Sequence, residues 1–292
     1  MLISLVALME AEGPGTIPLT TGELMQGALL QHVAGVSREA AGLLHGDRDV
    51  PRPYTISPLM CDHEQLRNRE LVIAKGDRTW FRVTGLNAGV AELLMEMASR
   101  TSRWDLRTAS TAAQFRINHW RSRASEHPWS GCVSHEGLWQ SAYYAMKRQP
   151  DRIWLDFETP TGFDGPADHW PNWNHLPLPQ SVFGSLRKRQ RILAPDFGKP
   201  PEGEERLETA VALGKFKVQS HALRFEKHGS TESGFTGSCE YLIHPEAAQE
   251  EVFWLHLLGG LAFYTGVGMK TSWGMGMTRR SRYLDFTYRG SE

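Results

Sequence analysis

Four glycines surround a single lysine in the segment Phe263-Tyr-Thr-Gly-Val-Gly-Met-Lys-Thr-Ser-Trp-Gly-Met-Gly-Met277. The glycines stand at positions 266, 268, 274 and 276, and Lys270 is the segment's only cation. Because glycine carries no Cβ, such a backbone can bring its N–H groups directly against a polyanion. The structural alternative is that these glycines only end a helix and bend a buried strand.

The elements on either side of the glycine segment restrict which anion it could bind. Upstream, Pro245 and early acidic residues followed by dense apolar residues predict a helix. Downstream, Tyr283-Leu-Asp-Phe-Thr-Tyr288 alternates as a strand does. Dinucleotide and P-loop sites have the opposite order, strand then loop then helix, so that the phosphate meets a helix N-terminus. The order found here argues against both.

Periodicity predicts the same order of elements, βαββαβ, in both halves of the chain. In the first half we expect strands over 2–9, 53–60, about 70–84 and 105–118, with helices over 22–33 and 89–100. In the second half we expect strands over 153–157, 215–219 and 235–243, helices over 179–192 and from 245, and the closing strand. The stretches 125–150 and 159–179 are interpreted as linker and insertion. The prediction is an α+β fold of two tandem ferredoxin-like (RRM-like) domains, 1–148 and 149–292.

A second motif gives the glycine segment a family context. The stretch Leu44-His-Gly-Asp-Arg-Asp-Val-Pro-Arg-Pro-Tyr-Thr-Ile-Ser-Pro-Leu59 places a histidine before a Pro-aromatic-Thr-x-Ser-x-Leu strand. This motif and the spacing G-x-G-x5-G-x-G near the end of the chain resemble the CRISPR-associated endoribonucleases of the Cas6 family, in the RAMP superfamily. The resemblance is specific at these two motifs and loose between them.

The resemblance implies a metal-independent endoribonuclease that cuts CRISPR repeat RNA in precursor transcripts. The ribose 2′-OH would attack the adjacent phosphorus, leaving a 2′,3′-cyclic phosphate and a 5′-OH, so the protein needs proton-transfer groups and cations. His45 is the candidate for proton transfer, and an exposed loop histidine is the alternative. His32 is an assisting candidate, or a histidine that interacts with its helix dipole. Arg52 stands where the family frequently has lysine, and it could neutralise phosphorane charge but is a poor proton donor.

The same resemblance implies two RNA-binding elements. The glycine segment would hold the RNA backbone, and the basic run 187–191 would contact phosphates of the repeat. A solvated helix face is the alternative for the basic run. Tyr264 and Trp273 could stack on unpaired bases, although core positions are more common for such residues. The RNA-binding candidates are Gly266, Gly268, Lys270, Ser272, Gly274, Gly276, Arg187, Lys188, Arg189 and Arg191.

Composition limits the remaining possibilities. The net charge of the 292 residues is -1, so any RNA site must be a local patch. No H-E-x-x-H, C-x-x-C or G-x-S-x-G occurs, and we expect neither a metal nor a cofactor. Three cysteines cannot form an even disulfide framework, which favours a reducing compartment. The apolar start lacks a basic region, and no segment reaches the roughly 18–20 apolar residues of a membrane span. We therefore expect a cytoplasmic protein.

The expected partners are repeat RNA and the guide RNA product, with other CRISPR-associated proteins as further candidates. The protein would be a monomer or a homodimer. A non-catalytic RAMP subunit that only binds guide RNA shares the glycine segment and the fold, and it would make His45 incidental. A general RNA-binding protein unrelated to CRISPR is a third reading.

Overall fold

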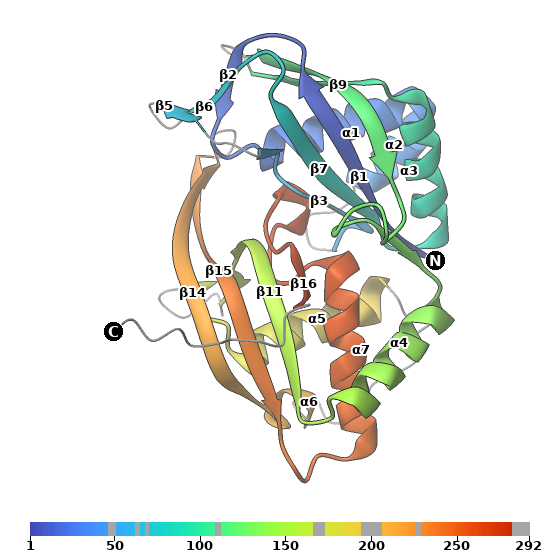
Figure 1. The fold of residues 1–292 in the computed structure, drawn as a ribbon, viewed down its shortest axis with the longest axis vertical. Coiled ribbons are helices and arrows are strands. Elements are labelled where there is room, and N and C mark those ends of the chain that lie inside the picture. The colour runs from blue at the N-terminus through green and yellow to red at the C-terminus, as the bar shows by residue number, and fades with distance from the viewer. Residues whose placement is uncertain are drawn as a thin grey trace.

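A computed structural model describes residues 1–45, 51–61, 65–67, 70–108, 112–165, 173–193, 206–225 and 229–281. These residues form two units, each with its own sheet, that lie one above the other along the long axis (Figure 1). One hydrophobic core belongs mainly to each unit.

The first unit is built on a sheet with β1 at its centre. Its main strands are β1 (Leu2–Ala11), β3 (Tyr54–Ile56), β7 (Arg78–Gly85), β8 (Arg103–Arg107) and β9 (Ala112–Arg121), in the order β3-β7-β1-β9-β8. The helices α1 (Gly22–Val36) and α3 (Ala88–Arg100) complete the order βαββαβ, and all neighbouring strands are antiparallel. This is the ferredoxin-like arrangement that the periodicity predicts.

Smaller elements decorate the first unit. β2 (Gly15–Pro18), β6 (Glu70–Ile73) and β5 (Gln65–Arg67) form a small separate sheet, while β4 (Met60–Cys61) pairs with β7 and β10 (Gly131–Val133) pairs with β1. The short helix α2 (Arg38–His45) follows α1. Alternation along β1 and β9 sends Leu5, Ala7 and Phe115 into the core with Leu29 of α1 and Leu94 of α3.

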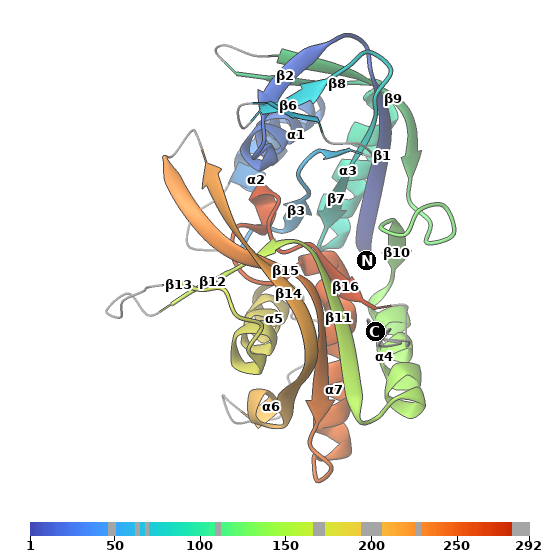
Figure 2. The ribbon, with the colours of Figure 1, turned by 60° about the vertical axis from the view of Figure 1, so that its left-hand side comes forward.

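The second unit repeats the same order. Its strands β11 (Arg152–Thr161), β14 (Val211–Phe225), β15 (Ser230–Ile243) and β16 (Thr278–Arg280) are arranged β14-β15-β11-β16. The helices α5 (Pro179–Leu193), α6 (Arg206–Thr209) and α7 (Gln249–Thr265) lie on one side of this sheet (Figure 2). β12 (Phe163–Asp164) pairs with β13 (Trp173–Asn174), and a single 3-10 turn, η2 (Thr271–Trp273), precedes β16. The prediction of two tandem ferredoxin-like domains is confirmed.

Two details of the sequence-based prediction differ from the structure. The strand that closes the second sheet is β16, while the predicted strand 283–288 lies outside the described residues. The stretch 125–150, interpreted as linker, contains β10 and a 14-residue helix, α4 (His135–Arg148). α4 packs against α7 through Leu138, Ala142 and Met146, which recur every four residues. The predicted domain boundary between residues 148 and 149 stays a prediction. α4 precedes this boundary in the sequence but packs against the core of the second unit.

The C-terminus of α7 is where the two units are joined. A helix leaves its last carbonyl groups without partners inside the helix. Here Ala262 accepts from the Gly266 N–H at 3.0 Å, Phe263 accepts from Arg82, and Tyr264 accepts from the Thr84 hydroxyl at 2.9 Å. Arg82 and Thr84 both lie on β7 of the first unit. The first unit therefore supplies the donors that end a helix of the second.

Arg82 is held on every side. Its side chain is buried, its Nε donates to Ser4 Oγ at 2.7 Å, and its guanidinium lies 4.6 Å from the Phe263 ring centroid and 5.5 Å from that of Trp129. Burial lowers the pKa of Arg82 to about 9, which leaves it cationic at neutral pH. A buried cation is tolerated when carbonyl groups and aromatic faces replace water.

We expect Arg82→Met to lower the free energy of unfolding by about 2–4 kcal/mol, because the Phe263 carbonyl loses its charged donor while remaining buried. The matched control is Arg78→Met on the same strand, whose side chain is exposed. Urea unfolding of the two variants tests this. Equal stability of the two variants would show that Arg82 does not carry the junction.

His256 of α7 is also buried, and its environment favours the neutral ring. Its Nδ1 accepts from Arg280 of β16. Burial and the Arg280 charge lower the pKa of His256 to about 3, although the Gln149 backbone and Asp151 act in the opposite direction. A histidine whose pKa is lower in the folded chain binds its proton more readily after unfolding.

The protein should therefore lose stability as the pH falls from about 6.5, the ordinary histidine value, toward about 3. His256→Gln keeps an acceptor for Arg280 but does not titrate, so its unfolding free energy should fall less over this range. His244→Gln, at an exposed position, should behave like the parent protein. Thermal midpoints between pH 7 and pH 4 test this, and parallel curves for all three proteins would contradict it.

Candidate functional site

The glycine segment lies at the junction of the two units, with η2 against α1 and β3 (Figure 1). Close backbone contact is possible because glycines stand on both sides. A Cβ on Gly22, at the start of α1, would lie 1.7 Å from the Trp273 carbonyl oxygen. A Cβ on Gly274 would lie 2.9 Å from the Pro58 nitrogen. The junction therefore requires small residues at both positions.

The four segment glycines are buried, and the N–H groups of Gly266, Gly268 and Gly276 donate within the protein, so RNA binding by this backbone stays a prediction. The Gly268 N–H donates to Ser185 Oγ at 2.9 Å, and the Gly276 N–H donates to the Pro160 carbonyl at 3.0 Å. All four have φ between 65° and 89°, a region that side chains disfavour. The glycines shape the segment, and its side chains are what it presents.

Lys270 is one of those side chains. It is the only described non-glycine residue with positive φ, at 51°. Its Nζ lies 2.7 Å from Glu232 Oε1 of β15 and 4.6 Å from the Trp273 ring centroid. The Lys270 side chain is 26% exposed, so solvent can reach it. The β14–β15 hairpin thus reaches the glycine segment and holds its cation (Figure 2).

Arg52 reaches the glycine segment from the other unit. Its Nη1 lies 3.4 Å from Ser272 Oγ. Next to it, the buried Tyr54 hydroxyl accepts from Gln26 Nε2 at 3.0 Å, and Gln26 Oε1 accepts from Trp273 Nε1 at 2.8 Å. Burial raises the pKa of Tyr54, while the Arg52 charge and hydrogen bonds from Gln26 and Arg52 lower it. Two of the predicted site residues, Arg52 and Ser272, are therefore brought together from 220 residues apart.

The two predicted histidines have different surroundings. His45 is the last residue of α2 and is exposed, and the polar loop 46–50 after it lies outside the described residues. His32 lies six residues after Gln26 on α1, and its ring stacks on Trp104 at 4.6 Å between centroids. Burial lowers the pKa of His32 and the charge of Asp105 raises it. His32 therefore packs on the first unit's core, and its assisting role in catalysis stays a prediction.

The basic run of α5 also divides into two groups. Arg189 is buried and donates to the carbonyls of Thr265 at 3.2 Å and Gly268 at 2.5 Å. Arg187 pairs with Glu208 at 2.8 Å. Both arginines therefore have partners inside the protein, and phosphate contact by the whole run stays a prediction. Lys188 and Arg191 are exposed and stay available for that role.

Gln26 is the site residue that sequence reasoning missed. It is a single glutamine on a predicted helix, and its partners Tyr54 and Trp273 stand 28 and 247 residues away. Helix periodicity alone carries no signal for such contacts. From the sequence, Trp273 and Tyr264 are expected to stack on bases or to pack in the core. Trp273 is half-buried, and its indole N–H donates to Gln26. Tyr264 is buried.

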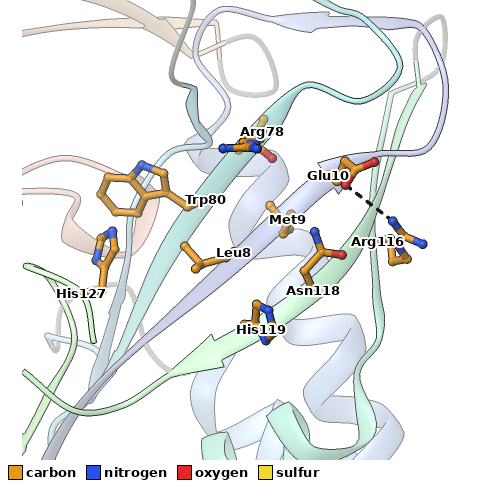
Figure 3. Close-up of a pocket in the computed structure, with 10 residues that line it drawn as sticks. Leu8, Met9, Glu10, Arg78, Trp80, Arg116, Asn118, His119 and His127 are labelled. Atoms are coloured by element: carbon orange, nitrogen blue, oxygen red, sulfur yellow. Dashed lines mark ion pairs between the residues drawn. The ribbon is translucent and has the colours of Figure 1, made fainter. Parts of the chain in front are cut away.

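A separate hollow of about 780 Å³ lies on the face of the first sheet formed by β1, β7 and β9 (Figure 3). Trp80 and His127 meet edge to face there at 4.8 Å, and Arg116 pairs with Glu10 at 3.5 Å. Arg78 is exposed at its rim. Burial, followed by the Arg279 charge, lowers the pKa of His127. This face offers aromatic rings and guanidinium groups together.

Within the described part of the chain, no three histidine, cysteine, aspartate or glutamate side chains are grouped closely enough to hold a metal ion. None of the helices described combines the length and apolar character needed to span a bilayer.

Comparison with known proteins finds similar sequences and folds. Residues 155–278 match the family model of CRISPR-associated endoribonuclease Cas6. A solved structure described as a Cas6 product complex is 25% identical, with a TM-score of 0.69, and the match covers 96% of this chain and 99% of that one. Thermus thermophilus Cas6 is 24% identical, with a TM-score of 0.67 and coverage of 96% and 98%. A Cas6-related protein of Pyrococcus furiosus is 11% identical, with a TM-score of 0.62 and coverage of 97% and 99%. No curated protein sequence matches the chain.

The family model matches the part of the chain that holds α5, the β14–β15 hairpin and the glycine segment, while the solved Cas6 structures extend the match to both units. The chain is therefore similar to the Cas6 endoribonuclease family by sequence over residues 155–278, and to solved Cas6 structures by fold over both units.

Proposed function

We propose that this protein cleaves CRISPR repeat RNA within precursor transcripts and retains the guide RNA product. The observation that carries the proposal is the meeting of Arg52 with Ser272 at the junction, beside Lys270. Two partly exposed cations from different units converge there, and convergent cations are what a developing phosphorane charge requires. Among the similar solved structures are a Cas6 product complex and a Cas6 substrate mimic complex.

The reaction needs only groups of the chain and of the RNA itself. A 2′-OH attacks the adjacent phosphorus in line, its proton leaves to a base, and the 5′ oxygen departs with a proton. His45 is the proton-transfer group in this proposal, because it is exposed at the end of α2 and histidine is the side chain most often used as a general acid or base. Arg52 neutralises phosphate charge without giving up a proton, so the leaving oxygen takes its proton from a histidine or from water.

Lys270 joins this site in competition with Glu232. The ion pair at 2.7 Å is only partly exposed, and a phosphate would have to replace the carboxylate as the lysine's partner. A phosphodiester carries one negative charge, as the carboxylate does, so the exchange is favourable only where the same RNA also contacts Arg52. Lys270 then binds RNA chiefly after docking.

RNA outside the cleavage point would use the remaining basic and aromatic surface. Lys188 and Arg191 of α5 are exposed cations on the second unit. On the first sheet, Trp80 and His127 can stack on unpaired bases while Arg78 contacts phosphate (Figure 3). The alternative function, a RAMP subunit that binds guide RNA without cutting, would use these surfaces and leave His45 without a role.

Purified protein should cut repeat RNA at one position in the presence of EDTA. A single 2′-deoxy substitution before the scissile phosphate should abolish the cut, because it removes the nucleophile. His45→Ala should lower the single-turnover rate by about 10²–10⁴-fold, the usual contribution of a general acid or base. His244→Ala, at an exposed position in the second unit, is the matched control.

Three results of this experiment would count against the proposal. A requirement for Mg²⁺, or normal cutting of the 2′-deoxy RNA, would exclude 2′-OH attack. Tight binding of repeat RNA with no cut by the parent protein would favour the non-catalytic alternative.

Trp80→Ala should weaken binding of uncleavable repeat RNA by about 5- to 150-fold, since one base–aromatic stack contributes about 1–3 kcal/mol. The cleavage rate at saturating RNA should stay within about twofold, because Trp80 lies outside the Arg52 cluster. Trp139→Ala, which removes an exposed tryptophan from α4, controls for loss of aromatic surface. Unchanged affinity in the Trp80 variant would remove the sheet face from the RNA path.

A further inference from the structure

A chain of side-chain contacts begins and ends on neighbouring residues of the glycine segment. Ser272 Oγ meets Arg52 Nη1 at 3.4 Å, and Arg52 lies beside the Tyr54 hydroxyl. That hydroxyl accepts from Gln26 Nε2 at 3.0 Å, and Gln26 Oε1 accepts from Trp273 Nε1 at 2.8 Å. This series of side-chain contacts crosses between the two units twice, at Arg52–Ser272 and at Gln26–Trp273.

The chemistry of the donors fixes how Gln26 is oriented. An indole N–H can only donate, so the amide oxygen of Gln26 must face Trp273. The amide nitrogen is then left to face Tyr54, whose hydroxyl oxygen must accept. One residue therefore has to accept at one end and donate at the other, which a neutral amide does and a carboxylate does not.

We propose that Gln26 is a positioning residue for RNA cleavage, which holds Arg52 in place through Tyr54 without contacting RNA itself. The proposal rests on the proposed function, in which Arg52 meets the phosphate. Arginine has many rotamers, and its catalytic value depends on being held before the substrate arrives. Ser272 Oγ accepts from the Arg52 guanidinium at 3.4 Å. The Arg52 charge acts on the Tyr54 hydroxyl two residues later in the sequence, and Gln26 holds that hydroxyl at 3.0 Å.

The proposal explains why a glutamate would not serve at this position. A carboxylate would still accept from Trp273, but it would force Tyr54 to turn its own hydroxyl proton toward it. Tyr54 is fully buried, so the new negative charge would be weakly screened and would attract Arg52. Among the described residues, Lys270 stands two residues before Ser272 and pairs with Glu232, and Glu23 stands one turn before Gln26 on α1.

A protonated glutamate, by contrast, reproduces the amide. Its carbonyl oxygen accepts from Trp273 and its O–H donates to Tyr54, with nearly the same shape as glutamine and no charge. This equivalence separates a positioning role from simple packing, because packing does not depend on the protonation of an isosteric side chain.

The test is single-turnover cleavage of repeat RNA by Gln26→Glu between pH 8 and pH 4.5, expressed as a ratio to the parent protein at each pH. At neutral pH we expect a rate about 10- to 100-fold below the parent, the cost of misplacing a catalytic group by about 1 Å. Affinity for uncleavable 2′-deoxy RNA should stay within about twofold. The ratio should rise toward one as the pH falls, because the carboxyl group takes up its proton.

Two variants make the test decisive. Gln26→Leu removes both hydrogen bonds and should lose activity at every pH without recovery. Gln31→Glu adds the same charge to an exposed position on α1 and should follow the parent protein at every pH.

A Gln26→Glu rate that equals the parent at neutral pH, or a ratio that stays flat with pH, would overturn the proposal. An equal loss of rate and affinity that follows a lowered thermal midpoint would also overturn it, since that result indicates a packing role. If the parent protein makes no cut in EDTA, the proposed function itself fails and the positioning role fails with it. Cutting by the parent together with a flat ratio rejects the role of Gln26 alone.

Discussion

The arrangement of the whole molecule depends on how the carbonyl groups at the end of α7 are satisfied. Four carbonyls need donors there, and three receive them from side chains: Arg82 and Thr84 of the first unit and Arg189 of α5. Hydrogen bonds to charged donors contribute about 1.5–3 kcal/mol each, whereas an unsatisfied buried carbonyl costs a similar amount. The negative end of the helix also favours the nearby guanidinium groups. The carbonyl groups at the end of α7 are therefore fully hydrogen-bonded only when the two units are joined.

The same contacts determine where the glycine segment runs. Arg189 holds the Thr265 and Gly268 carbonyls, and the turn that follows is pressed against α1, where only glycine at position 22 leaves room for the Trp273 backbone. Lys270 and Ser272 are thereby presented at the junction and not on either unit alone. A site assembled in this way has a simple physical consequence. Its cations are correctly spaced only when the helix end, the turn and the first unit are all in place.

The fold could be predicted from the sequence because it depends on local patterns. Alternation in β1 and helical spacing in α3 and α5 are visible without any partner. α4 was missed because Trp139, Tyr143 and Tyr144 are exposed, which hides the buried series Leu138, Ala142 and Met146. At the site, separate motifs contain Arg52 and Ser272, and the structure places their side chains 3.4 Å apart. The position of Gln26 in the site could not be inferred, because its two hydrogen-bond partners lie in distant segments of the sequence.

The basic residues show that a sequence motif identifies where positive charge lies but not which group that charge contacts. Arg187 and Arg189 belong to the most basic run of the chain, yet Glu208 and two backbone carbonyls occupy them. A net charge of -1 leaves little general attraction for RNA, so the proposed recognition has to rely on local groups of accessible cations. Arg189 does not need to contact RNA to support binding, because it holds the glycine segment in place. Its hydrogen bonds fix the course of the glycine segment, which places Ser272 beside Arg52 of the other unit.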